Sequence, residues 1–225
     1  SIMVRGLTGF HGNVGYYIPQ RETEGYGLNG KALEKLAGEG YTLLITVDCG
    51  ISSADLIAEA PKGLDIIVTD HHTPPDVLPQ CVAVINPHQK DCHYPYKELA
   101  GCGVAYTLCR ALYMKREGHD YDGTVELAAL GTIADVVSLT GENRIIVKEG
   151  MKRFLHTPVK GLAALLKASG IVHEDTKEIK RADQVSFGLA PRLNAAGRIA
   201  QASEGVKLMT TDSMEEAESL AQKLC

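Results

Sequence analysis

The chain has no tryptophan and only three phenylalanines, and no apolar run approaches the roughly 18 residues that a membrane-spanning helix needs. Its first residues also lack the basic and then apolar pattern of a signal peptide. Nothing in these residues therefore indicates a membrane anchor. We expect a soluble, cytoplasmic protein without a membrane partner.

The sequence also lacks paired cysteines and an excess of basic residues. Its six cysteines form no CxxC pair, and scattered thiols of this kind are typical of the reducing cytoplasm. With 23 Lys and Arg against 28 Asp and Glu, the net charge is −5. A broadly basic nucleic-acid-binding module is therefore disfavoured, and any contact with a polynucleotide has to be local.

What is present is enough material for one large domain, or a domain and a subdomain: 225 residues, 44% of them hydrophobic. In the first part, short β-branched runs alternate with helical patterns, which predicts a parallel sheet flanked by helices. The expected strands are 15–18, 41–48, 64–70 and 82–85, and the expected helices are 2–7, 28–38 and 52–63.

From about residue 100 onward only helical periodicity recurs. We therefore predict an α/β fold whose parallel sheet is followed by an all-helical subdomain. The expected division is an α/β part at 1–99, a helical part at 100–210, and the start of an interdomain linker helix at 211–225.

Metal-binding side chains follow two of these strands directly. Asp48 is the last residue of the strand at 41–48. Asp70 is the last residue of the strand at 64–70, and His71 and His72 follow it. Parallel strands joined by one crossover helix tend to be neighbours, and ligands bind at the carboxyl edge of such sheets. Mixed carboxylate and imidazole ligands suit Mn²⁺, Mg²⁺, Fe²⁺ or Zn²⁺. An Asx turn is the plainer explanation of Asp48.

Several motifs together resemble a known family. VDCGIS at 47–52 and VTDHH at 68–72 are similar to the DHH phosphoesterase superfamily, and within it to the RecJ-type single-strand-specific 5′→3′ exonucleases. The further blocks of this resemblance are YIPQR at 17–21, EGYGL at 24–28, INPH at 85–88, LAGCGVAY at 99–106, LGTIADVV at 130–137 and LAPRLNAAGR at 189–198.

The resemblance implies phosphodiester hydrolysis with two divalent ions, Mn²⁺ or Mg²⁺. It makes Asp48 the bridging ligand, and His71 and Asp135 further ligands of one ion. His72 would contact the scissile phosphate, and Asp70 would orient an imidazole. Without the resemblance, Asp135 could equally be a helix cap or a buried hydrogen-bonding group.

The implied substrate is single-stranded DNA with a 5′ end, and single-strand-binding protein is a candidate partner. The resemblance assigns Arg21 to a 5′-terminal phosphate, and Arg192, Asn194 and Arg198 to DNA or phosphate binding. The simpler alternatives are an exposed loop arginine at Arg21 and an interdomain ion pair at Arg192 and Arg198.

Two other functions stay open. One is a related hydrolase for oligoribonucleotides, cyclic dinucleotides or pyrophosphate. The other is a catalytically silent replication scaffold, which would not need Asp48, Asp70, His71, His72 and Asp135 together. RecJ-type enzymes also carry an Asp-rich first motif, and a C-terminal substrate-binding domain with a glycine-rich motif, outside the segment matched here. We therefore expect these 225 residues alone to have little nuclease activity.

Overall fold

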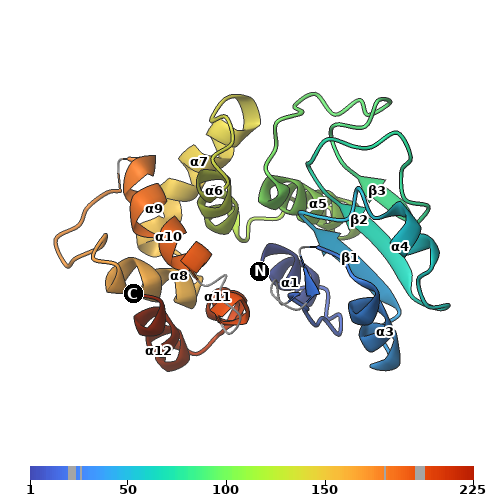
Figure 1. The fold of residues 1–225 in the computed structure, drawn as a ribbon. Coiled ribbons are helices and arrows are strands. Elements are labelled where there is room, and N and C mark those ends of the chain that lie inside the picture. Colours follow the sequence, from blue (N-terminus) through green and yellow to red (C-terminus); the bar gives the residue numbers. More distant parts are fainter. Residues whose placement is uncertain (20–23, 26, 180, 196–200) are drawn as a thin grey trace.

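The computed structural model describes residues 1–19, 24–25, 27–179, 181–195 and 201–225. Its elements, in chain order, are α1 (Ile2–Thr8), α3 (Gly30–Gly38), β1 (Leu43–Val47), α4 (Ala54–Ala58), β2 (Asp65–Thr69), β3 (Ala83–Ile85), α5 (Gly101–Glu117), α6 (Val125–Ala134), α7 (Gly141–Arg153), the 3₁₀ helix η1 (Phe154–His156), α8 (Lys160–Ala168), α9 (Ala182–Gly188), α10 (Ala190–Ala195), α11 (Gln201–Thr210) and α12 (Met214–Leu224). Figure 1 shows the sheet with α3 and α4 on one side of the molecule, the helices from α7 onward on the other, and α1, α5 and α6 between them. The predicted fold class is confirmed.

The sheet is parallel with the order β1-β2-β3. Leu43 pairs with Asp65 and Val47 with Thr69, so β1 and β2 end at the same level. The crossover between them carries α4, as predicted. Because both strands stop together, the residues that follow them meet at one edge of the sheet.

The apolar run at 41–48 is typical of a strand buried on both faces, but β1 is not buried in this way. Among the described strands β1 has a partner on one side only, and Leu43 and Val47 at its two ends are 47% and 40% exposed. Its apolar run reads like that of β2, whose Ile66 and Val68 are buried. An apolar sequence pattern predicts that a strand has an apolar face, but it does not predict whether another element covers that face.

The predicted strand at 15–18 is wrong. Residues 12–19 form neither a helix nor a strand. A cavity of about 770 Å³ is lined both by this segment and by residues of β1. A strand requires ladder hydrogen bonds from a neighbour, and none of the described strands pairs with residues 15–18.

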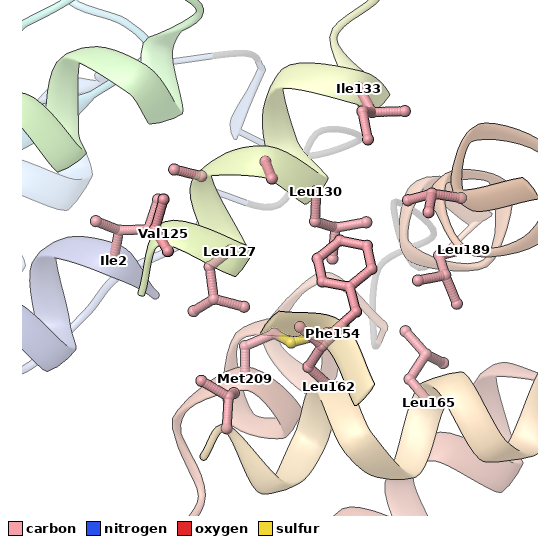
Figure 2. Close-up of a cluster of buried hydrophobic side chains, with 14 of the residues drawn as sticks. Ile2, Val125, Leu127, Leu130, Ile133, Phe154, Leu162, Leu165, Leu189 and Met209 are labelled. Carbon is pink, nitrogen blue, oxygen red and sulfur yellow. The ribbon is translucent and has the colours of Figure 1, made fainter. Parts of the chain in front are cut away.

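The helical half is built around α6, which packs against α5, α7 and α9. All but two residues of α6 are buried. Figure 2 shows Leu127, Leu130 and Ile133 of α6 reaching the same cluster as Phe154, Leu162 and Leu165. An apolar stretch without an amphipathic pattern is what a central helix needs, because it has neighbours on every side.

The sheet has its own small core, made by Leu33 of α3, Ile57 of α4 and buried residues at or beside β2. Helix α5 joins the two halves, because it contacts β1 and β2 on one side and α1 and α6 on the other. The division at residues 99 and 100 stays a prediction. No helix in the described ranges is both long and apolar enough to cross a membrane.

Candidate metal centre

Asp48 follows β1 in a strained backbone conformation. Its φ is +64°, in the left-handed region that non-glycine residues seldom adopt. The Asp48 N–H donates to the carbonyl of Thr69 at 3.0 Å, so the pairing with β2 continues one residue past the strand. This turn fixes the backbone position of Asp48, and with it the start of its side chain, at the sheet edge. Strain of this kind is typical of functional sites.

Asp70 is the buried anchor of the second strand end, with 1% of its surface exposed. One carboxylate oxygen accepts from the backbone N–H of Ile51 at 3.0 Å. The other accepts from the N–H groups of His71 and His72 and lies 2.7 Å from Nδ1 of His72. Burial alone would raise the pKa of Asp70, but these hydrogen bonds outweigh it and the pKa is lowered. Asp70 therefore stays ionised and contacts the His72 ring, and its role in orienting that imidazole stays a prediction.

His71 lies between two carboxyl groups that come from different halves of the molecule. Its Nε2 is 2.9 Å from Oδ1 of Asp48 and 3.7 Å from Oδ2 of Asp135. The hydrogen bond with Asp48 raises the pKa of His71 against the opposing effect of burial, and the charge of Asp135 adds to the rise. The structure thus brings together the three side chains that the sequence analysis names as ligands.

Asp135 reaches the site from the end of α6, where it caps the helix and donates its N–H to the carbonyl of Gly131 at 2.9 Å. Desolvation raises its pKa, the charge of His71 opposes the rise, and the Asp48 carboxylate adds to it. Val136, the next residue, has a φ of +58° and is 85% exposed. The chain therefore leaves the helix abruptly at the point where it presents this carboxylate.

The donor set fits a divalent cation. Within the described ranges, Asp48, His71 and His72 each offer one ligand atom, and these atoms lie within 4.8 Å of one another. A cation held by the same atoms would compete with protonation of His71. Carboxylate oxygens with imidazole nitrogens suit Mn²⁺, and a set richer in oxygen suits Mg²⁺.

Asn86, after β3, is a supporting residue to which the sequence analysis assigns no role. It is 2% exposed, and its Nδ2 donates to the carbonyl of His72 at 2.9 Å. It thereby fixes the backbone of the DHH segment from the third strand. Its position directly after a predicted strand is the signal that could have identified it.

The structure describes only some of the predicted phosphate-binding residues. The guanidinium of Arg192 donates to the carbonyl of Gly188, one turn away across the junction of α9 and α10. The side chain of Asn194 lies outside the described part, as do Arg21 and Arg198. Their binding roles stay predictions.

The fold and the site together define an α/β protein with a carboxylate–imidazole centre at the carboxyl edge of its parallel sheet. The chain belongs to the DHH family: the model of the DHH family, N-terminal domain, matches residues 1–132.

Several similar proteins are named RecJ. The chain is 44% identical over 225 residues to the single-stranded-DNA-specific exonuclease RecJ of Bacillus subtilis (strain 168), covering 100% of this chain and 28% of that protein. It is 40% identical to the RecJ of Escherichia coli (strain K12), covering 94% and 38%. The chain thus spans well under half the length of these relatives.

Solved structures agree with the sequence comparison. Exonuclease RecJ bound to manganese matches with a TM-score of 0.85 at 38% identity, over 99% of this chain and 55% of that one. RecJ in complex with Mn²⁺ from Thermus thermophilus matches with a TM-score of 0.83 at 36% identity, over 99% and 31%.

Proposed function

We propose that this chain is the catalytic core of a single-strand-specific DNA exonuclease, which hydrolyses phosphodiester bonds from the 5′ end with Mn²⁺ or Mg²⁺. The observation that carries the proposal is the convergence of two carboxyl groups on His71, which follows β2. Asp48, after β1, and Asp135, at the end of α6, each place an oxygen within 3.7 Å of Nε2 of His71. The RecJ names of the relatives support the choice of substrate.

Divalent ions bound at this centre would supply activation of water and neutralisation of charge on the reacting phosphate. Asp48, His71 and Asp135 would hold the ions, with Nε2 of His71 lying between the two carboxyl groups. Asp70 holds Nδ1 of His72, so Nε2 is the nitrogen left for a phosphate oxygen. Arg21, Arg192, Asn194 and Arg198 are the proposed contacts to the DNA backbone.

The proposal includes an expectation about the isolated chain. Activity would require segments that the longer relatives have and that these 225 residues do not match, so we expect little activity from the chain alone. The proposed location is the cytoplasm, where the free cysteines of the described ranges would stay reduced. The three-part division at residues 99 and 210 and a single-strand-binding protein partner belong to the same proposal.

The test compares this chain with a version extended at both ends to the length of its relatives. Both are incubated with 5′-phosphorylated single-stranded DNA and Mn²⁺. The extended protein should degrade DNA from the 5′ end. Its D48A and H71A variants should lose at least about 100-fold in rate, because each loses charge stabilisation at the reacting phosphate.

D55A and H119A are matched controls, since Asp55 and His119 are exposed and lie outside the site; they should keep the full rate. An extended protein that leaves DNA intact but cleaves short oligoribonucleotides, cyclic dinucleotides or pyrophosphate would keep the metal chemistry and overturn the substrate. Full activity from the 225-residue chain would contradict the expectation about the isolated core.

A further inference from the structure

The first turn of α5 lies directly against Asp48. A Cβ placed on Gly101, the first residue of this helix, would be 2.4 Å from Oδ1 of Asp48 and 2.7 Å from its Cγ. Those distances leave no room for any side chain. The carboxyl group of Asp48 therefore packs on the bare backbone of a helix N-terminus, where unpaired N–H groups favour negative charge.

Cys102, the next residue of α5, contacts α6. Sγ of Cys102 lies 3.4 Å from the carbonyl oxygen of Ala128 and 3.5 Å from Oγ1 of Thr132, both on α6. Between these two, a Cβ on Gly131 would be 2.7 Å from Sγ of Cys102 and 2.9 Å from its Cβ. Cys102 thus fills the space that a side chain on Gly131 would need.

Gly131 in turn is tied to the second carboxylate. Its carbonyl accepts the N–H of Asp135, one helical turn later. A continuous series of contacts therefore runs from Asp48 through Gly101, Cys102 and Gly131 to Asp135. It crosses from the sheet half to the helical half by way of two glycines that cannot take a methyl group without displacing a neighbour.

We propose that Gly101 and Gly131 are positioning residues that set the separation of Asp48 and Asp135, with Cys102 as the spacer between them. The inference rests on the proposed metal role of the two carboxylates. It assigns a function to three residues that touch neither an ion nor a substrate. Cys102 acts through its volume, and its thiol has no chemical part.

The first test is Mn²⁺ binding by the 225-residue chain, measured with MnCl₂ by the electron paramagnetic resonance signal of free Mn²⁺. We expect G101A to bind at least about tenfold more weakly, because displaced ligands typically lose roughly 10- to 100-fold in affinity. G30A is the matched control: Gly30 also opens a helix, but its added Cβ would meet only Leu56 Cδ1 at an ordinary 3.7 Å. It should bind within about twofold of the parent chain.

The second test is rescue at the other glycine. G131A should also weaken Mn²⁺ binding. The double variant G131A/C102A keeps the 2.9 Å contact with the Cys102 Cβ and should recover partly, whereas G131A/C102G removes both contacts and should recover fully. Destabilisation by overpacking would be relieved in the same order, so each variant has to be folded when its Mn²⁺ binding is compared. Thermal unfolding in EDTA identifies any variant that is not folded at the assay temperature.

Crystal structures of the parent chain and of G101A separate the two possible failures. If the parent chain takes up no Mn²⁺, the proposed metal role fails. The positioning role is still supported in that case if the Asp48 and Asp135 carboxyl groups are separated differently in G101A and in the parent chain. Unchanged separation, G101A affinity within about twofold of the parent, or no recovery in G131A/C102G would each overturn the inference.

Discussion

At the scale of single residues, the centre depends on how completely Asp70 is surrounded by donors. Four N–H groups, from Ile51, His71, His72 and the ring of His72, converge on its two oxygens. Each oxygen therefore already accepts its hydrogen bonds before any ion or substrate binds. An amide in the same position could not reproduce this arrangement, because one of its two ends is itself a donor.

The first prediction follows from that arrangement. Asp70→Asn should lower the free energy of unfolding by about 2–3 kcal/mol, because an NH₂ group would face a buried N–H and a charged hydrogen bond is lost. Urea unfolding in EDTA measures the change. Asp76→Asn is the control, since its side chain is fully exposed. Equal stability of D70N and the parent would show that the donors rearrange without cost.

Val136 allows a second test at this scale, because a β-branched residue at a φ of +58° is strained. Val136→Gly should raise the free energy of unfolding by about 1 kcal/mol, the relief of strain exceeding the entropy that glycine adds to the unfolded state. Val77→Gly, at an exposed position where φ is not positive, should give no gain. A loss of stability in V136G comparable to that in V77G would argue against strain at Val136.

At the scale of elements, α6 and α7 approach each other closely at Gly150. An added Cβ there would lie 2.3 Å from Cβ of Ala129 and 2.7 Å from the carbonyl oxygen of Val125. We predict that Gly150→Ala destabilises the fold by about 1–3 kcal/mol through overpacking, although alanine is the better helix former.

Gly205→Ala in α11 is the matched control for this prediction. Nothing in the described part of the chain lies within 4 Å of its added Cβ, so the intrinsic preference for alanine should stabilise the chain by up to about 1 kcal/mol. Chemical unfolding of both variants measures the two effects. A stabilised G150A would show that α7 can move away from α6 freely.

The elements also show what sequence can and cannot predict. Asn29 accepts the Ala32 N–H and Ser213 the Glu216 N–H, so these caps are local signals that predict helix starts correctly. Helix α9 has no side-chain cap of this kind. Gly188 and Pro191 also interrupt the helical pattern between α9 and α10, so the helices in this segment depend on tertiary packing. The strand expected at 15–18 fails for the opposite reason: its local pattern is adequate, but none of the described strands pairs with it.

The centre follows the same rule. Asp48 and the DHH segment are predictable from the residues alone, since both follow parallel strands joined by one crossover. Asp135 approaches from a helix 63 residues beyond His72, and only the resemblance identifies it. Gly101 and Gly131 could not be identified at all, because the reason for each glycine is a side chain far away in the sequence.

At the scale of the whole molecule, buried ionisable groups link the helical core to pH. Burial raises the pKa of the Cys109 thiol, at the contact of α1 and α5, from its ordinary 9.0 to about 11. It raises the pKa of Tyr121 in the same core from 10.0 to about 12. Both groups stay neutral in the folded chain at a pH where the unfolded chain ionises them.

The sign of the resulting pH dependence is fixed. The stability that these neutral forms contribute is fully present below pH 9 and is lost as pH rises through the window from 9 to 12, by at most about 1.4 kcal/mol per pH unit for each group. Cys109→Ala should flatten the loss between pH 9 and 11. Urea unfolding across this range measures the slope. An unchanged slope in C109A would exclude the thiol as its cause.

The open side of β1 has a consequence for the chain in concentrated solution. Leu43 and Val47 are exposed at the two ends of a strand that, among the described elements, has a neighbour on one side only. Unpaired backbone N–H and C=O groups beside apolar side chains are a template on which another extended segment can add. Two copies of the chain could join their sheets along this side, so self-association should compete with access to the adjoining Asp48. Solubility and metal binding would then depend on the same few residues.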